Sequence, residues 1–513
     1  MKKIYFLLFS GCCIFQRLYA QLPEDALRLS WTAPSGTARQ QAIGGAMGSL
    51  GGDISSIFVN PAGLGIYKTS EIVISPGFRY LKDKNSYLGM GASGSAAKNF
   101  NLGTSGFVLG WGTPTGSGAF GLAVNRMANF GSHLYYKGQN SYSSGAEQYS
   151  EEFSNSHLGI DEALGTTALT YATRMALYTS LIDTVRVNGG DLEVIAQPQK
   201  TDRVDQEMDL RTSGGITEIA LSLAGNSYDK WYFGGSLGLP IINYSRTTTY
   251  RESDASGNTN NDFDSYTYRE DYSAKGFGLN LKMGAIFRPT ASWRVGLAIH
   301  TPTISGITEK ISGSMIARTE GYTSLPQVSI NTDTLDQLSQ TSARSFDYDQ
   351  YTPWKFIVSG SWLFGGAEQD TRRQKGFISA DIEYVTINSS RFRPGNDNTD
   401  PNYFDDVNNT IKSYYKGSIG AHLGGEMKFN TLMARAGVAY YTSPYRDSQL
   451  KADKLFVSAG LGYRNKGMFV DLAYVAGFSK DINFPYRLSD KDNVFASLKE
   501  TSGTALLTVG FKF

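Results

Sequence analysis

The last ten residues of the chain, Thr504–Phe513, read TALLTVGFKF. Apolar residues occupy every second position and share one face of an extended strand, namely Ala505, Leu507, Val509, Phe511 and Phe513. The opposite face carries threonine, glycine and lysine, with Leu506 the one exception. The same alternation recurs at 467–475 and 292–300, where charged residues such as Asp471 and Arg294 fall on the second face. These segments predict strands with one apolar and one polar side.

Fourteen such segments follow residue 70, with ends uncertain by a few residues. They are roughly 70–81, 102–112, 118–130, 215–225, 231–249, 266–288, 292–318, 353–364, 375–387, 414–428, 431–441, 455–464, 467–477 and 504–513. The connections between them alternate between short turns and long loops, the longest at about 131–214. Tight turns at one end and long loops at the other are typical of an outer-membrane β-barrel. We therefore expect an all-β, transmembrane antiparallel barrel of about fourteen strands over 70–513.

Composition supports this fold class and argues against others. The chain has 57 Gly, 31 Tyr and 28 Phe but only 15 Pro, and beyond the first 20 residues no apolar run is long enough for a transmembrane helix. A formal net charge of +1 makes nucleic acid a poor partner. The alternative is a large soluble all-β protein such as a propeller or jelly roll, but a propeller would show a repeat of about 40–50 residues, and none is found.

The first 20 residues have the pattern of a secretory signal. Lys2 and Lys3 precede an apolar core, and Ala20 is a small residue at the expected cut. The two cysteines, Cys12 and Cys13, lie inside this segment, so the mature chain would hold neither a disulfide nor a thiolate site. A competing interpretation makes 10–12 a lipoprotein cleavage box, although Phe9 fits that pattern poorly.

Residues 21–69 precede the first strand and contain the densest glycine cluster of the chain. Gly44 and Gly45 open the cluster, and Asn60-Pro61-Ala62 follows it. A phosphate-binding loop is not supported, because no Lys-Ser or Lys-Thr pair follows the glycines. A flexible surface arm is the other alternative, but apolar residues are too frequent between the glycines. The pattern favours a compact plug that packs where space is tight.

The stretch 36–65, GTARQQAIGGAMGSLGGDISSIFVNPAGLG, resembles the N-terminal hatch of the outer-membrane long-chain fatty-acid transporter family, FadL and its aromatic-hydrocarbon relatives. The likeness extends to 354–360 and to 435–444, RAGVAYYTSP. It implies a fourteen-stranded barrel plugged by the hatch, which takes up hydrophobic molecules passively and releases them sideways at an inward kink in the third strand. The matching strand is 118–130. The loops depart from the family pattern, so its loop-built capture site cannot be transferred.

The hatch motif and the lumen supply the candidate site residues. Pro61 and Asn60 should form a defined bend, with Ala62 small enough to sit against a wall strand, and we expect this bend to hold the plug beside the opening in the third strand. By strand parity, six polar side chains face the lumen: Arg294, His300, Asp381, Glu383, His422 and Arg435. Most such groups are solvated or paired across the lumen. Contact with the hatch or with a ligand carboxylate is the alternative, for which Arg435 is the best candidate.

Enzymatic and metal sites are not supported. The four histidines have no helical zinc spacing, and Ser418 and His422 lie four strand positions apart, about 13 Å, too far for a catalytic pair. The acidic loops 254–264 and 397–406 could hold calcium, but neither matches an EF-hand and solvated loop is the stronger interpretation. We expect no enzyme activity, no cofactor and no metal.

The C-terminal residues and the long loop indicate the partners of the protein. Phe511 and Phe513 resemble the C-terminal signal by which the barrel assembly machinery recognises its substrates. The partners are then that machinery, outer-membrane lipids and a hydrophobic ligand, with the barrel a monomer. Within the long loop, 161–182 has helical spacing and forms either an apolar lip or a helix packed on its own loop. The alternative function is a non-transporting family member that serves as a docking platform in a protein-secretion system. An apolar pocket behind the hatch would favour transport, and a filled lumen the platform.

Overall fold

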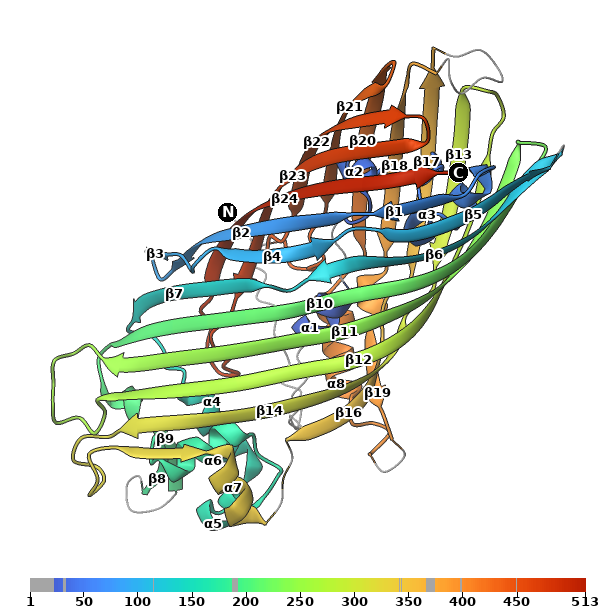
Figure 1. Cartoon of the computed structure of the whole chain (residues 1–513). Helices are drawn as coiled ribbons and strands as arrows, with labels where there is room; N and C mark the ends of the chain where they lie inside the picture. Colours follow the sequence, from blue (N-terminus) through green and yellow to red (C-terminus); the bar gives the residue numbers. More distant parts are fainter. Residues whose placement is uncertain are drawn as a thin grey trace, which may run out of the picture.

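The protein folds as a closed antiparallel β-barrel (Figure 1). A computed structural model describes residues 23–30, 34–113, 115–186, 192–340, 342, 344–365, 374–396, 399–448 and 450–513. Within these residues the chain passes fourteen times along the barrel wall, each pass antiparallel to its neighbours. The predicted fold class is confirmed, whereas the expected signal segment 1–20 lies outside the described residues.

Single strands make up eight of these passes in the described chain: β10 (Val204–Ser227), β11 (Trp231–Asp254), β12 (Ser265–Phe287), β20 (Ser418–Phe429), β21 (Leu432–Tyr441), β22 (Lys454–Asn465), β23 (Met468–Asn483) and β24 (Ala496–Lys512). Six passes consist of two consecutive segments: β1 (Glu71–Ile74) and β2 (Pro76–Tyr87), β4 (Ala97–Leu102) and β5 (Ser105–Thr113), β6 (Gly116–Asn129) and β7 (Ser132–Asn140), β13 (Trp293–His300) and β14 (Ile304–Arg318), β16 (Ser345–Tyr351) and β17 (Lys355–Phe364), β18 (Gly376–Val385) and β19 (Arg391–Pro394).

The first and last strands close the barrel. β1 pairs with β24 from Glu71–Lys512 to Ile74–Val509, and β2 continues along β24. At the very end, the backbones of Ser70 and Phe513 exchange two hydrogen bonds of 2.9 and 3.0 Å. Closure leaves no free edge at this junction, as a sheet in lipid requires.

The two faces of the wall have the predicted polarity. On β23, Leu472 and Tyr474 are exposed on the outside, whereas Asp471 and Ala473 are buried within. On β24, Phe511 points outward, and Leu506, the exception in the alternation, is buried on the inside. The outer belt of exposed apolar residues on a closed barrel matches the hydrocarbon layer of a membrane. None of the described helices is long and apolar enough to cross a membrane.

Several strands are longer than predicted. The third pass does not end at residue 130, because β7 continues it to Asn140, and β10 begins at Val204 instead of 215. The longest loop is therefore 141–203, and the predicted 131–214 is wrong. Likewise, residues 405–414 form a helix, so the strand predicted from 414 begins at Ser418. Burial still alternates along β7, but its exposed residues Lys137 and Gln139 are polar, so the sequence lacks the apolar face used to find the strands.

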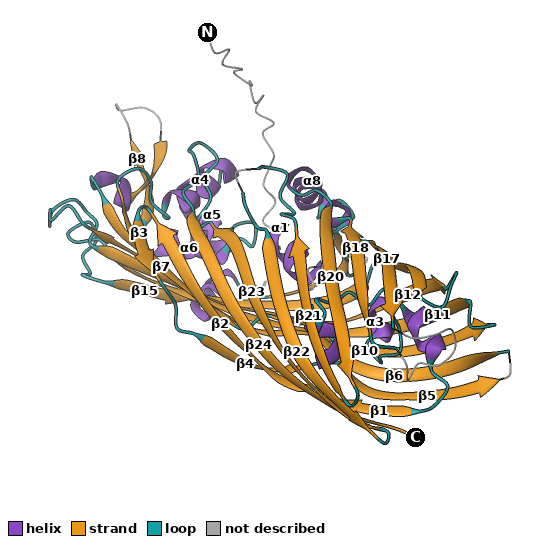
Figure 2. Cartoon of the chain, turned by 90° about the horizontal axis from the view of Figure 1, so that it is seen from above, coloured by secondary structure: helices purple, strands orange, loops and turns teal. Residues whose placement is uncertain are grey.

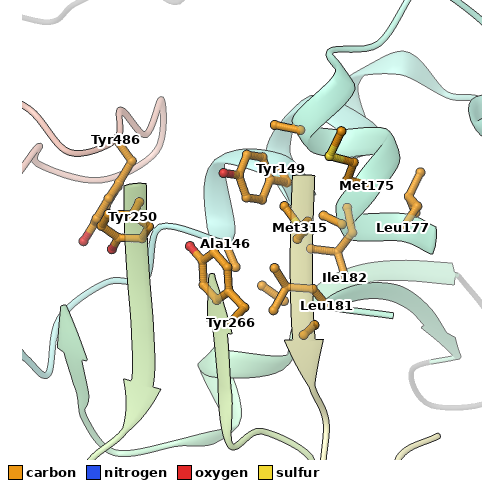
Figure 3. Close-up of a cluster of buried hydrophobic side chains, with 14 of the residues drawn as sticks. Ala146, Tyr149, Met175, Leu177, Leu181, Ile182, Tyr250, Tyr266, Met315 and Tyr486 are labelled. Atoms are coloured by element: carbon orange, nitrogen blue, oxygen red, sulfur yellow. The ribbon is translucent and has the colours of Figure 1, made fainter. Parts of the chain in front are cut away.

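The long loops form a folded cap at one end of the barrel. It contains the helices α4 (Glu147–Ser156), α5 (Ile160–Gly165), α6 (Tyr171–Tyr178), α7 (Thr332–Ser339) and α8 (Asp405–Tyr414), the short helices η2 (Gln197–Lys200) and η3 (Ile387–Ser389), the hairpin β8 (Ile182–Arg186) with β9 (Leu192–Ala196), and the short strands β3 (Met90–Ala92) and β15 (Val328–Asn331). Figure 3 shows Met175 of α6 and Tyr149 of α4 packed with Met315 and Tyr266 of the wall. The segment 161–182 is two helices and mostly packs on its own cap, although Tyr178 is exposed.

The first described residues, from 23 onward, lie within the curve of the barrel, where Figure 2 labels α1 and α3. Residues 34–69, here called the inner segment, include α2 (Ala38–Ala42), α3 (Ser56–Val59) and η1 (Pro61–Ile66). A further helix, α1 (Pro23–Ser30), lies nearer the cap and contacts α8. Almost every residue from 36 to 65 is buried against the wall or within the inner segment.

Candidate functional site

The inner segment begins with a helix that is tied to the last barrel strand. Thr37 caps α2 by accepting a hydrogen bond from the Gln40 amide at 3.3 Å, and its hydroxyl donates to the Asp53 carboxylate at 3.0 Å. The Ala38 amide donates to Oγ1 of Thr508 on β24 at 2.8 Å. Ala38 and Ala42 then pack on Leu506, which explains why that residue breaks the polar pattern of the inner face.

The glycines of the inner segment allow backbone to lie directly on the wall. Gly44 has a φ of +66°, and a Cβ there would lie 2.7 Å from the carbonyl oxygen of Val438 on β21. From the other side, a Cβ on Gly437 would lie 2.2 Å from the backbone of Ile43. Gly45 has a φ of +83° and faces the His422 ring. A larger residue at Gly44 or Gly437 would push the two backbones apart.

Four of the lumen-facing candidates bind the backbone of the inner segment. The Gly48 amide donates to Oδ2 of Asp381 at 2.8 Å, and Arg294 donates to the Leu50 carbonyl. The rings of His422 and His300 donate to the Gly44 and Val59 carbonyls at 2.9 and 2.8 Å. Glu383 instead pairs with Lys355 at 3.2 Å. These polar side chains make the hydrogen bonds that the buried backbone of the inner segment would otherwise make to water.

Arg435 is paired with carboxylates of the wall, and its contact with a ligand carboxylate stays a prediction. Its fully buried guanidinium donates to Glu426 at 2.7 Å and to Asp471 at 2.6 Å, so wall carboxylates already occupy it. Arg39 of α2 adds a second cation, with Nε 3.5 Å from Oε2 of Glu426. Nη2 of Arg435 has no hydrogen-bond partner among the described residues. The sequence shows that Arg435 faces inward but not that acidic residues on β20 and β23 would flank it.

Asn60-Pro61-Ala62 forms the predicted bend but contacts other strands than expected. Oδ1 of Asn60 accepts from the Ala62 amide at 3.1 Å, which starts η1, with Pro61 as its first residue. Nδ2 of Asn60 donates to the carbonyls of Gly48, Ala285 and Leu297 at 2.6, 3.3 and 3.3 Å. The last two belong to β12 and β13, so the Asn60 side chain itself binds strands other than the third, and the role of the bend at an opening in the third strand stays a prediction.

Apolar residues on both sides of the bend contact the third strand instead. Ile57 of α3 and Leu64 of η1 belong to one buried cluster with Ala119 and Ala123 of β6. A Cβ on Gly121 of β6 would lie 2.7 Å from the Ile57 side chain. Small residues on this strand therefore let the inner segment pack closely against it.

The wall is incomplete between the second and third passes. β5 and β6 form a ladder from Thr113–Gly116 to Ser105–Val124. Residue 114, in the turn between them, is not among the described residues. Beyond Val124, the described residues of β4 pair with β2, and those of β7 pair with β10, but no ladder joins the two passes. The register of β6 on β10 also shifts at Ile216–Thr217. We call this interruption, between β4 and residues 125–135, the seam.

Side chains bridge the seam where backbone hydrogen bonds are missing. Nη1 of Arg79 donates to the Asn129 carbonyl at 2.9 Å, and Nδ2 of Asn99 donates to the Gly131 carbonyl at 3.1 Å. Further toward the cap, Asn85 donates to the Tyr135 carbonyl at 2.9 Å. Asn129 also donates to the Phe100 carbonyl at 3.4 Å, and the Ser95 hydroxyl lies 2.7 Å from Nδ1 of His133. Breaking such side-chain bonds costs less reorganisation than breaking a ladder, because the strand backbones stay paired on their other edges.

Two cavities lie in the lumen above the inner segment. The larger, of about 90 Å³, is lined by residues that include Leu29 of α1, Ile216 and Ile242. The smaller, of about 60 Å³, lies between Phe58 and Val59 of the inner segment and Asn125 and Met127 of β6. Met127, His300 and Lys355 line both. The smaller cavity thus reaches the strand that borders the seam.

The described residues contain no cluster of His, Cys, Asp or Glu that could hold a metal ion. Ser418 donates to the Thr442 carbonyl at 2.8 Å, while His422 binds the inner segment, so the two make no hydrogen bond to each other. The side chains that the fold brings together serve to hold backbone, not to activate a nucleophile.

No family model and no curated protein sequence matches this chain. Solved structures do. A FadL homologue of Pseudomonas aeruginosa matches over 94% of this chain and 99% of its own, with a TM-score of 0.56 at 13% identity. The Pseudomonas putida toluene transporter TodX matches over 93% of this chain and 99% of its own, with a TM-score of 0.51 at 12% identity.

This chain has the fold of the FadL-type barrels. It is accordingly an outer-membrane β-barrel, in agreement with its closed sheet and apolar exterior. Sequence reasoning missed the residues that bridge the seam. Arg79, Asn85 and Asn99 are ordinary polar residues of a strand, and their role is visible only once β4 and β7 are seen not to pair with each other.

Proposed function

We propose that this FadL-like barrel is a passive outer-membrane transporter of hydrophobic small molecules. The inner segment acts as the hatch, and the substrate leaves sideways through the seam. The observation that carries the proposal is the missing ladder between β4 and β7, beside a lumenal cavity bordered by Asn125 and Met127. The TodX likeness supports the substrate class, because that protein is a toluene transporter.

The seam suits an apolar molecule that moves toward lipid. On its outer side, Phe78 and Phe100 pack edge to face at 5.8 Å and are 68% and 58% exposed. A molecule that passes between the strands would meet these rings and then the membrane, without entering water. The gradient of the molecule itself drives this path, so no energy source is required. We retain a monomer, folded by the barrel assembly machinery, as part of the proposal.

One observation favours the docking-platform alternative. The cap is a packed structure, with Tyr149, Met175 and Met315 in a buried cluster, and the lumenal cavities are small. A rigid cap over a filled lumen is what a platform for secreted proteins would need. The two functions differ in one respect, since only the transporter requires the seam to open.

The test is a disulfide that locks the seam. Asn99 and Gly131 are in contact across it, so Asn99→Cys with Gly131→Cys gives a reversible crosslink. The matched control is Ser222→Cys with Ser236→Cys, whose hydroxyls lie 2.8 Å apart on the fully paired strands β10 and β11. Uptake of labelled toluene and of a labelled long-chain fatty acid is measured in cells with equal surface levels of each variant.

We expect the oxidised seam crosslink to reduce uptake at least tenfold and a reductant to restore it. The control crosslink should have no effect in either state. Equal uptake by the oxidised and reduced seam variants would refute lateral exit. Uptake no higher than in cells without the protein, for every variant and both solutes, would refute transport and favour the docking platform.

A further inference from the structure

Three lysines lie side by side on the outer face of the barrel wall, near the cap. Lys84 of β2 lies directly opposite Lys499 of β24, and Lys499 lies directly opposite Lys480 of β23. All three side chains are exposed, and Figure 1 shows the three strands as neighbours. We call these residues the lysine row. Two more exposed lysines flank it, Lys82 on β2 and Lys98 on β4.

The alternation of the strands separates positive from negative charge. In the sequence, each lysine of the row is next to an acidic residue, namely Asp83, Asp481 or Glu500. Successive residues of a strand point to opposite faces, so these carboxylates belong to the inner face. There Glu500 pairs with Arg79 at 3.4 Å, and Asp481 accepts a hydrogen bond from the buried Tyr445 hydroxyl at 3.5 Å. The outer face is therefore positive, although the local sequence is nearly neutral.

The lysines have no acidic partner in the part of the chain that the structure describes. None of the five forms an ion pair there, and β2 and β24 make theirs through Arg79 and Lys512. Asp453 lies next to Lys480, whose amide donates to the Asp453 carbonyl at 3.3 Å. The carboxylate of Asp453 instead accepts from the Tyr440 hydroxyl and a backbone amide, both at 3.0 Å.

Other strands of the wall neutralise their outward charges. Glu207 of β10 lies opposite Lys137 of β7 on one side and Arg251 of β11 on the other, and Oε1 of Glu207 is 3.8 Å from the Arg251 guanidinium. On β12, Arg269 pairs with Asp271 at 3.0 Å. Like charges that lie directly opposite each other destabilise a sheet. An anion from outside the chain would remove this repulsion from the lysine row.

The lysine row lies at the cap end of the apolar belt. On β24, the outward residues Phe511, Val509, Leu507 and Ala505 are exposed and apolar, and Lys499 follows toward the cap. About twelve positions separate Phe511 from Lys499, which at about 3.3 Å per residue and a tilt of about 45° is roughly 28 Å along the barrel axis. The apolar band of such barrels is about 25 Å tall. The lysine row therefore lies level with the lipid headgroups.

This position selects the anion. The long loops mark the cap end as extracellular, and the outer leaflet on that side is built of lipopolysaccharide, a glycolipid with phosphate groups. A phosphate offers several oxygens to ammonium groups. Just below the lysine row, Phe478 and Tyr80 are exposed and would contact acyl chains. Free phosphate would leave these rings uncovered, so the surroundings favour a lipid.

We propose that the lysine row binds a phosphate group of lipopolysaccharide, with the acyl chains of that lipid packed on Phe478 and Tyr80. The exposed hydroxyl of Thr501, between Lys82 and Phe478 on the neighbouring strands, is a further donor to the phosphate. The site is on the outside of the barrel and needs only its place in the outer membrane. It does not depend on whether the protein transports a solute.

The experiment measures lipopolysaccharide binding to purified barrel by native mass spectrometry. The row variant combines Lys84→Gln, Lys480→Gln and Lys499→Gln, and a second variant has arginine at the same three positions. The matched control removes the same charge from exposed lysines near the opposite rim, with Lys68→Gln, Lys230→Gln and Lys466→Gln. Each barrel is titrated with lipopolysaccharide and with the same glycolipid after removal of its phosphates, and inorganic phosphate is added as a competitor. All variants should keep the heat-dependent gel shift of a folded barrel.

Each lysine near an anionic membrane surface strengthens binding about fivefold, so the row variant should bind lipopolysaccharide about a hundredfold more weakly. The arginine variant and the opposite-rim control should stay within about twofold of the natural protein. Dephosphorylated glycolipid should bind the natural protein as weakly as lipopolysaccharide binds the row variant. Equal affinity of the row variant and the control, or equal binding of the two glycolipids, would overturn the proposal. Displacement of the lipid by an equal concentration of inorganic phosphate would overturn the lipid as ligand.

Discussion

The side chain of Asn60 fixes the bend of the hatch to the barrel wall, and its removal should make the barrel leak. The Asn60 amide has two N–H groups, so one serves Gly48 and the other is shared between Ala285 and Leu297. With the bond accepted from Ala62, Asn60→Ala removes about three hydrogen bonds, at roughly 1 kcal/mol each. About 3 kcal/mol shifts the balance between a seated and a displaced hatch by about two orders of magnitude.

The assay is the frequency of conducting openings of purified barrel in planar lipid bilayers. Gly284→Ala tests the same contact from the wall, since a Cβ there would lie 1.9 Å from Oδ1 of Asn60, and it should raise the frequency as well. Asn402→Ala, on an exposed loop of the cap, is the matched control. All variants should keep the heat-dependent gel shift of a folded barrel. If Asn60→Ala and Gly284→Ala open no more often than the control, Asn60 does not hold the hatch.

Three further changes test other parts of the structure. Phe513→Ser keeps the terminal backbone pairing but removes the aromatic end, so outer-membrane levels should fall; normal levels of heat-shifted protein would contradict an assembly role. Arg435→Met leaves two buried carboxylates short of a partner and should lower the free energy of unfolding by about 3–5 kcal/mol. Arg39→Met should lower it clearly less, because Arg435 remains beside Glu426. Urea unfolding monitored by gel shift shows which of the two variants is less stable. Gly437→Val should expel the neighbouring part of the inner segment, seen as faster hydrogen exchange there, and unchanged exchange would argue against the close backbone contact.

The barrel could be predicted from the sequence because its signal is local. Lipid on one side and a polar lumen on the other impose a period of two on each strand, as in Leu472 and Tyr474 against Asp471 and Ala473. Leu506 broke this period, and the structure shows that the inner segment covers it. Strand ends were less certain, because exposed residues of β7 such as Lys137 and Gln139 are polar and give no apolar face.

The candidate site could be predicted only in part, because a local pattern shows which way a side chain faces but not what it contacts. Parity placed Asp381, His422 and Arg435 correctly on the inner wall. Parity cannot say which residue of a distant segment each one meets, so it could not name Glu426 and Asp471 as the partners of Arg435.

The sequence by itself therefore determined the wall of this protein: its strands, its two faces and the side on which its long loops lie. Only the tertiary structure decided where the wall is interrupted, which strands hold Asn60, and that α1 packs among aromatic side chains of the wall and the loops. The physical reason is the range of the interactions. Alternation arises between neighbours in the chain and the solvent on each face, whereas the seam and the packing of α1 depend on contacts between segments far apart in the sequence.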